Sequence, residues 1–148
     1  MHEQLEAAER MVRHQLRARG VRDPAVLEAM TQVPRHRFVS EADAADAYAD
    51  KALPTADGQT ISQPYMVAVM TEQLRIEPGV KVLEVGTGSG YQAAILAHMG
   101  AQVVSIERSE TLARQARDVL GQLGWSDRVR VVVGDGTLGY PQEAPYDR

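Results

Sequence analysis

The sequence predicts an α/β domain in which a helical N-terminal part precedes a short, incomplete parallel sheet. Apolar segments rich in β-branched residues indicate three buried strands, at 82–85, 101–106 and 129–133. A helical pattern follows the first of them, from Tyr91 to His98. Strands that alternate with helices are typical of parallel sheets joined by crossovers.

The length of the chain, 148 residues, suits one domain. We therefore expect a single domain over 1–148. It divides at about residue 79 into a helical part with a loop, 1–78, and a β/α part, 79–148. Hydrophobic residues make up 44% of the chain, which is enough for a core.

Three helices are predicted in the first part. The first carries Leu5, Ala8, Val12 and Leu16 at helical spacing and stops at Gly20. The second opens at Asp23-Pro24, with aspartate as the cap and proline in the first turn, and its apolar face is Val26, Leu27, Met30 and Val33. The third opens at Gln63-Pro64 and places on one face Met66, Val67, Met70 and Leu74.

Glycines 86, 88 and 90 form the most informative motif, directly after the first strand. A junction of strand, glycine turn and helix presents backbone N–H groups and a helix N-terminus to a ligand. The dinucleotide fingerprint requires glycine at 91, where this chain has Tyr91. The spacing G-x-G-x-G after a strand that carries Glu84 resembles that of S-adenosylmethionine-dependent methyltransferases, which have a Rossmann-like fold. The alternative is a tight turn without a ligand.

Two further acidic residues suit an adenosyl ligand. Glu107 ends the second strand, 21 residues after Gly86, near the roughly 20 expected for a carboxylate that binds ribose hydroxyls. Asp135, next to Gly136, follows the third strand and is placed to accept from an adenine amino group. With Glu84 they are expected to converge on one edge of the sheet. The alternatives are a solvated charge at 107 and a plain turn at 134–136.

The polar segment 53–64 precedes the third helix. It is either an ordinary helix entry, with Ser62 at or near the cap, or a loop that carries hydroxyls and an amide over a cofactor. The pattern alone leaves both open. His36 is interpreted as a surface or structural histidine.

Composition excludes several classes of function. The net charge is −4 and basic residues do not cluster with aromatic ones, which argues against nucleic-acid binding. No apolar run approaches the ~20 residues that span a bilayer, and the acidic, helical N-terminus does not resemble a signal peptide. Cysteine is absent, so no disulfide or thiolate metal site is expected, in keeping with a cytoplasmic protein.

Across nearly its whole length, the chain resembles the protein-L-isoaspartate O-methyltransferase family, which repairs damaged proteins. The resemblance rests on motifs in the family's order and roughly its spacing: 33–36, 58–64, 83–94, 134–136 and 144–147. The specific part is Thr60-Ile61-Ser62, which generic methyltransferases do not carry.

The resemblance implies a reaction and roles for individual residues. The methyl group of S-adenosyl-L-methionine passes to the free α-carboxylate of an L-isoaspartyl residue, leaving S-adenosyl-L-homocysteine. Ser62 matches the family's active-site serine, and Glu107 matches its ribose-binding acid. Asp135 and Gly136 match the adenine-side contact. The loop over the cofactor is matched by Gln59 and Thr60.

Transfer of a methyl group to a carboxylate does not require a general base, and no such group is evident in the sequence. A side-chain carboxylate has a pKa of about 3.9, so the acceptor is already an anion at pH 7 and needs no general base. The reaction is an in-line displacement at the methyl group on the sulfur of the cofactor. Good alignment of the acceptor with this methyl group lowers the activation barrier by up to ~7–11 kcal/mol. We expect Ser62 to orient the acceptor and not to act as a nucleophile, because no histidine–carboxylate relay is evident.

The family's members are usually longer, and this chain stops at Arg148. The family's sheet order places the first strand between two others, so Lys81 to Val85 is expected to be an open edge. The resemblance implies a monomer, but such an edge favours self-association. The part of the family's chain that follows also supplies much of its acceptor pocket, so we expect this chain to bind the cofactor weakly. Two alternatives remain: a methyltransferase for another class of acceptor, and a non-catalytic fragment that only binds cofactor.

Overall fold

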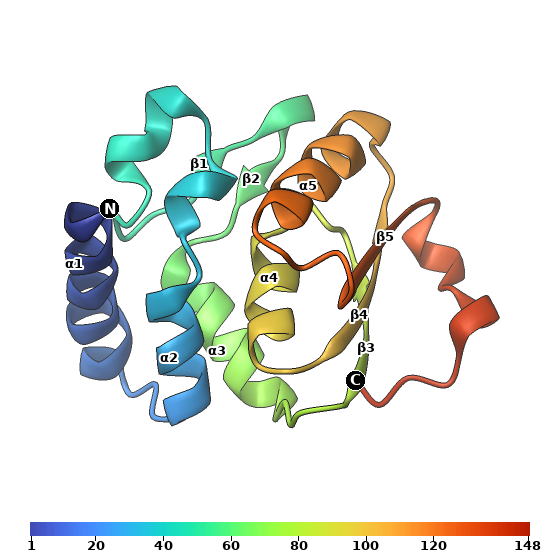
Figure 1. Cartoon of the computed structure of the whole chain (residues 1–148), viewed down its shortest axis with the longest axis horizontal. Helices are drawn as coiled ribbons and strands as arrows, with labels where there is room; N and C mark the ends of the chain where they lie inside the picture. Colours follow the sequence, from blue (N-terminus) through green and yellow to red (C-terminus); the bar gives the residue numbers. More distant parts are fainter.

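The computed structural model describes all residues from Met1 to Arg148. Helices from the N-terminal half lie beside a three-stranded sheet, and α4 and α5 cover the face of the sheet that is turned toward them (Figure 1). The segment that follows the last strand runs along the opposite side and returns to the first strand (Figure 1). This is the α/β architecture that the sequence predicts.

The parallel sheet is confirmed, and it consists of β3 (Lys81–Val85), β4 (Gln102–Glu107) and β5 (Val129–Val133) in the order β3-β4-β5. Helices α4 (Tyr91–His98) and α5 (Glu110–Gln122) form the two crossovers. Because the strands are parallel and connected through helices on one side, their carboxyl ends meet at the same edge.

The first predicted helix is confirmed, although it is not regular throughout. Helix α1 spans His2–Met11 and continues through a π-helical turn, Val12–Leu16, and a 3₁₀ turn, Arg17–Arg19. Gly20 ends it with a φ of 96°, a left-handed conformation that suits glycine. The buried stripe begins at Ala8, because the side chain of Leu5 is exposed.

Helix α2 (Pro24–Gln32) begins where the sequence predicts. The carboxylate of Asp23 accepts a hydrogen bond from the N–H of Ala25 at 2.9 Å, so the aspartate caps the helix. All four residues of the predicted apolar face are buried: Val26, Leu27, Met30 and Val33.

Helix α3 (Pro64–Leu74) is also confirmed, but half of its predicted apolar face is wrong. Met66 and Met70 are exposed, whereas Val67, Ala68 and Thr71 are buried. Thr71 tolerates burial because its hydroxyl donates to the carbonyl of Val67 at 2.7 Å. The N-cap residue is Gln63 and makes no side-chain capping bond, so Ser62 does not cap this helix.

Short elements connect these parts. A small antiparallel hairpin pairs β1 (Leu53–Pro54) with β2 (Thr60–Ile61). The remaining elements are 3₁₀ turns at Arg35–Phe38, Glu41–Asp46, Ala56–Gly58, Gly136–Leu138 and Pro141–Glu143.

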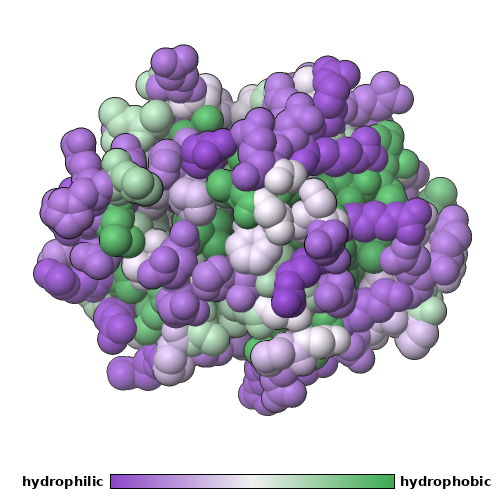
Figure 2. Space-filling view, in the orientation of Figure 1, coloured by the Kyte–Doolittle hydropathy of each residue, from purple (hydrophilic) through white to green (hydrophobic).

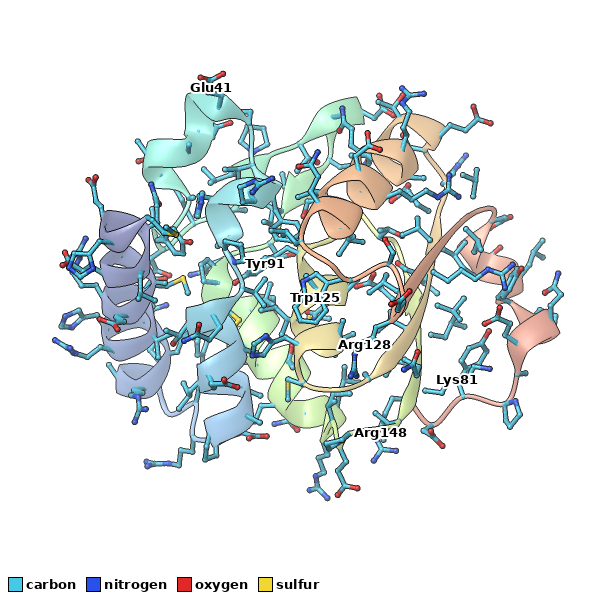
Figure 3. All side chains as sticks on the ribbon, in the orientation of Figure 1. Glu41, Lys81, Tyr91, Trp125, Arg128 and Arg148 are labelled. Atoms are coloured by element: carbon cyan, nitrogen blue, oxygen red, sulfur yellow. The ribbon has the colours of Figure 1, made fainter.

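One continuous core of 30 buried hydrophobic residues joins the helical part to the sheet. Tyr91, the first residue of α4 and labelled in Figure 3, faces the N-terminal part, and its ring lies edge-on to that of Phe38 with 5.5 Å between the ring centroids. The surface seen in Figure 2 is mainly hydrophilic, with small apolar areas between polar side chains. None of the helices has the length and apolar composition of a transmembrane span.

The expectation of a fully open edge at β3 is wrong for its first half. The N–H groups of Asp147 and Arg148 donate to the carbonyl of Lys81, and the N–H of Leu83 donates to the carbonyl of Arg148. The last two residues therefore form backbone hydrogen bonds with the first half of β3. Beyond them the edge is open, and Val85 is 62% exposed.

Gly90 offers a direct test of how the glycine turn packs. Its φ is 91°, and an added Cβ would lie 3.3 Å from Cβ of Ala116 in α5. Left-handed backbone costs an L-residue roughly 1–2 kcal/mol, and overpacking adds about 1–3 kcal/mol. We predict that Gly90→Ala lowers the free energy of unfolding by roughly 2–5 kcal/mol, measured by urea denaturation.

Gly124 is the matched control, because its φ is 84° and an added Cβ there would meet no atom within 4 Å. Gly124→Ala should lower the free energy of unfolding only by the cost of left-handed backbone, roughly 1–2 kcal/mol. Equal losses in the two variants would show that contact between the turn and α5 is unimportant.

Candidate functional site

The glycine turn is built by backbone conformations that favour glycine. Gly86, Gly88 and Gly90 have φ angles of 89°, 55° and 91°. Their N–H groups are not free, contrary to the expectation from the motif. They donate to the carbonyl of Ile106, to the carboxylate of Glu107 and to the carbonyl of Thr87. At its three glycines the turn therefore gives a ligand a close backbone without side chains, and the glycine N–H groups do not form the cradle that binds a phosphate.

Glu107 is held rigidly at the end of β4. One carboxylate oxygen accepts from the N–H of Gly88 at 2.9 Å, and the other accepts from the N–H of Ser109 at 2.7 Å. The residue is only 7% exposed, yet it lines a cavity. Because each carboxylate oxygen has two lone pairs, each retains the capacity for one further hydrogen bond.

This cavity, of about 600 Å³, will be called the acidic cavity. It lies at the carboxyl edge of the sheet, between the β1–β2 hairpin and the segment after β5. Of the residues that the sequence singles out, it gathers seven: Gln59, Thr60, Gly86, Gly88, Glu107, Asp135 and Gly136. Gln59 and Thr60 are exposed residues of the hairpin, as expected for a loop that lies over a ligand.

Asp135 and Gly136 occupy the far wall of the acidic cavity. One oxygen of Asp135 accepts from the hydroxyl and the N–H of Thr137, at 2.7 and 3.0 Å, and these bonds lower the pKa of its carboxyl. A Cβ at Gly136 would collide with Cγ1 of Val85, so any larger residue would force the side chain of Val85 to move. Asp135 thus contributes a hydrogen-bond acceptor, and Gly136 contributes to the shape of the cavity wall.

A second hollow, of about 350 Å³, will be called the serine groove. It contains Ser62 and Glu84 and runs along β3 beside α3. The two hollows share four residues, Thr60, Val85, Gly86 and Gly88. The glycine turn therefore separates the acidic cavity from the serine groove by the width of a backbone. Gly90 lines neither hollow and is buried under α5.

Glu84 does not stand at the strand end, as the convergence of three acids would require. It is the fourth residue of β3, opposite Ser105 of β4. The hydroxyl of Ser105 contacts both its carboxylate and the hydroxyl of Thr87. Burial raises the pKa of Glu84 to about 7, aided by the negative charge of Glu107 and opposed by the Ser105 hydrogen bond. Glu84 is therefore partly protonated at neutral pH.

Ser62 is exposed in the serine groove, directly after β2. Its backbone carbonyl accepts from Nη2 of Arg35 at 2.8 Å. His36 has the structural role that the sequence indicates: its Nδ1 lies 2.9 Å from the hydroxyl of Tyr48, and burial lowers its pKa.

Sequence reasoning missed three residues that shape the site. Arg35 holds the backbone of Ser62, and Ser105 holds Glu84. Ser109 binds Glu107 through its N–H, and its hydroxyl both caps α5 and contacts Asp57 of the hairpin loop. Only Ser109 carries a local signal, as a serine before a helical pattern. The other two act across distances that periodicity does not show.

The comparisons with known proteins agree on one family. The family model described as protein-L-isoaspartate(D-aspartate) O-methyltransferase matches residues 6–148. The protein-L-isoaspartate O-methyltransferase of Methanoculleus marisnigri is 57% identical over 139 residues, which are 94% of this chain. That of Syntrophus aciditrophicus is 56% identical over 138 residues. The chain spans 63% of the length of each of these two relatives.

Two solved structures that superpose on the chain carry the same description. One protein-L-isoaspartate O-methyltransferase superposes with a TM-score of 0.84 at 31% identity, covering 95% of this chain and 46% of that one. A chain described as such an enzyme from Plasmodium falciparum, in complex with S-adenosyl-L-homocysteine, gives a TM-score of 0.70 at 25% identity, covering 84% of this chain and 62% of that one.

The raised pKa of Glu84 predicts a pH-dependent stability. Between pH 4.5 and 7 the carboxyl is ionised in the unfolded chain but still protonated in the folded one. Stability from this group is therefore fully present below about pH 4.5 and is lost as the pH rises to about 7. We predict that Glu84→Gln removes this loss, which is on the order of 1–3 kcal/mol, in urea titrations across that range.

Glu77→Gln is the control, because Glu77 is exposed and lies outside both hollows. Its pH profile should run parallel to that of the unmodified chain. A parallel profile for Glu84→Gln as well would contradict the assignment of a raised pKa to Glu84.

Proposed function

We propose that this chain, which belongs to the protein-L-isoaspartate(D-aspartate) O-methyltransferase family, transfers a methyl group to damaged proteins. The donor is S-adenosyl-L-methionine, and the acceptor is the free α-carboxylate of an L-isoaspartyl residue. The observation that carries the proposal is the junction of the acidic cavity with the serine groove at the glycine turn. A cofactor on one side would thus meet an acceptor on the other.

The acidic cavity suits an adenosyl cofactor. Glu107 keeps one acceptor position on each oxygen, which matches the paired hydroxyls of a ribose. Asp135 has an oxygen that makes no protein hydrogen bond, which suits an adenine amino group. Gln59 and Thr60 would cover the ligand from the hairpin. Carboxylates outnumber cationic side chains in the cavity lining, which favours a ligand with positive charge.

When bound, S-adenosyl-L-methionine supplies an electrophilic methyl group on a positively charged sulfur. The chain's task is to bring an already ionised acceptor carboxylate into line with it. The hydroxyl of Ser62 is exposed in the serine groove and is free to donate to an acceptor oxygen. His36, the histidine nearest to Ser62 in sequence, is bonded to Tyr48, so we assign Ser62 to orienting the acceptor and not to attacking it.

The chain spans 63% of the length of the relative from Methanoculleus marisnigri, so its activity has to be measured on the chain itself. The two alternatives predict different experimental results: a methyltransferase for another acceptor methylates without regard to isoaspartate, and a binding fragment holds cofactor without turnover. We place the activity in the cytoplasm, because the chain has no cysteine that an oxidising compartment would pair.

The test is methyl incorporation from labelled S-adenosyl-L-methionine into paired peptides that differ only in an isoaspartyl or an aspartyl residue. We expect methylation of the isoaspartyl peptide alone. Ser62→Ala should lower kcat/KM by about 10- to 100-fold, because a hydrogen bond to a charged group contributes ~1.5–3 kcal/mol. Binding of S-adenosyl-L-homocysteine, measured by calorimetry, should change little.

Each other outcome has a clear meaning. Equal methylation of both peptides favours another acceptor class. Cofactor binding without any methylation favours the binding fragment. Unchanged kcat and KM in Ser62→Ala would remove Ser62 from the mechanism.

A further inference from the structure

Arg35 is a fully buried cation in the interior of the protein, with 0% of its surface exposed. Its guanidinium donates through Nε to the carbonyl of Ala47 at 2.6 Å and through Nη2 to the carbonyl of Ser62 at 2.8 Å. Its Cζ lies 4.9 Å from the ring centroid of Tyr91, in cation–π geometry. Three segments that are distant in sequence therefore meet on one side chain.

These contacts are an unusual environment for a buried charge. None of the ion pairs includes Arg35, and its Nη1 is buried without any hydrogen-bond partner. Buried charges without a carboxylate are unfavourable, and apolar residues of similar volume often serve stability as well or better. An apolar residue could not replace the two hydrogen bonds that Arg35 donates to the carbonyls of Ala47 and Ser62.

The bond to Ser62 has no substitute within the structure. Ser62 precedes the N-cap of α3, so its carbonyl lies outside the helical hydrogen-bond ladder. The only donor that reaches this carbonyl is Arg35. On the other side of the guanidinium, Tyr91 is the first residue of α4 and follows the glycine turn directly. Arg35 thus spans the distance between the serine and the turn that forms the cofactor side.

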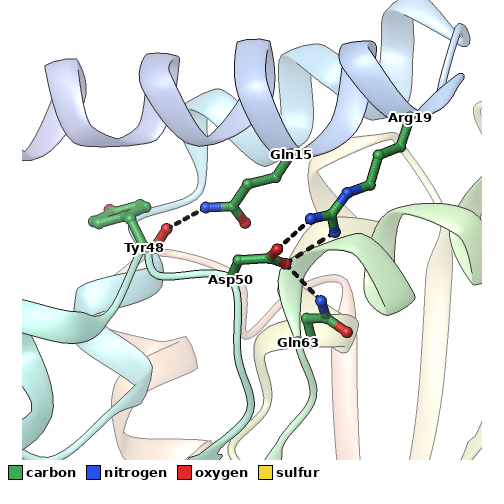
Figure 4. A network of polar contacts seen from close by, with 5 residues as sticks. All are labelled: Gln15, Arg19, Tyr48, Asp50 and Gln63. Carbon is green, nitrogen blue, oxygen red and sulfur yellow. Dashed lines mark hydrogen bonds and ion pairs between the residues drawn. The ribbon is translucent and has the colours of Figure 1, made fainter.

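A second contact secures the next residue. The carboxylate of Asp50 accepts from Nε2 of Gln63 at 2.5 Å and is itself paired with the guanidinium of Arg19 (Figure 4). Gln15, also from the first helical segment, donates to the carbonyl of Tyr48 at 2.7 Å (Figure 4). The side chain of Gln63 is therefore fixed from the surface, while the backbone of Ser62 is fixed from the interior.

We propose that Arg35 is a positioning residue, which fixes the backbone of Ser62 relative to the glycine turn so that the serine hydroxyl meets the acceptor. The effect of Arg35 on catalysis rests on the proposed function. The fixing of Ser62 itself is a property of the fold and can be measured without turnover.

The chain has no cysteine, so Ser62→Cys introduces a single thiol at the position in question. The rate of its alkylation by iodoacetamide reports how the residue is held. We expect Ser62→Cys with Arg35→Met to react several-fold faster or slower than Ser62→Cys alone, under native conditions. Arg37→Met is the matched control, because Arg37 lies in the same 3₁₀ turn but contacts Gln122 on the surface. It should leave the alkylation rate unchanged.

In chains that retain Ser62, the catalytic readout is the separation of kcat from cofactor affinity. Arg35→Met should lower kcat by about 10- to 100-fold, because small misplacements of a positioned group cost that much. The Kd for S-adenosyl-L-homocysteine should change by less than about threefold, because Arg35 does not line the acidic cavity. Arg35→Lys, which keeps the charge but not the forked donors, should restore stability more fully than kcat.

An alkylation rate that Arg35→Met does not change, or a kcat per folded molecule equal to that of the unmodified chain, would overturn the proposal. If Arg35→Met does not fold, Arg35→Lys decides by the same two measurements. If the unmodified chain transfers no methyl group, the proposed function fails, and the alkylation rates alone decide whether Arg35 positions Ser62.

Discussion

The candidate site depends on the two hydrogen bonds that the carboxylate of Glu107 accepts. It accepts one hydrogen bond from the glycine turn and one from Ser109, so it joins the β3–α4 junction to the start of α5. Ser109 in turn caps α5 and contacts Asp57 in the hairpin loop. One anion therefore sets the relative positions of the turn, the helix and the hairpin around the acidic cavity. Its burial among N–H donors is favourable because charged acceptors form the stronger hydrogen bonds.

The role of the glycines follows from this arrangement. In a site for phosphate, the N–H groups of such a turn point at the ligand. Here the N–H groups of Gly86, Gly88 and Gly90 are bonded within the protein. The positive φ angles and the absence of side chains let the backbone lie between two hollows. A ligand without phosphate, recognised by carboxylates, is consistent with such a turn.

Local patterns predicted the strands, the capped second helix and the position of Glu107, because each depends on spacing along a single segment. The same patterns failed where partners are far apart in sequence. The pairing of residues 147–148 with β3, the exposure of Met66 and Met70, and the bond between Glu84 and Ser105 are all of this kind. Arg35 belongs to this group too: its neighbours in sequence are a proline and a histidine, and nothing local indicates its contact with Ser62.

The helical N-terminal part thus does more than complete the core. It supplies the guanidinium beneath Ser62 and, through Arg19 and Asp50, the contact to Gln63. The sheet supplies the acidic cavity, and the two parts meet at Tyr91 and Thr60. A fold divided in this way would keep cofactor binding and acceptor alignment on separate elements.

The most direct measurement is calorimetric titration of S-adenosyl-L-homocysteine into the chain and into its Glu107→Gln variant. A glutamine offers one oxygen acceptor and one N–H₂ donor, so it cannot accept from Gly88 and Ser109 together. If Glu107 organises and lines the cofactor cavity, Kd should rise by about 10- to 100-fold, as expected for the loss of hydrogen bonds to a charged group. A Kd within about threefold of that of the unmodified chain would contradict that role.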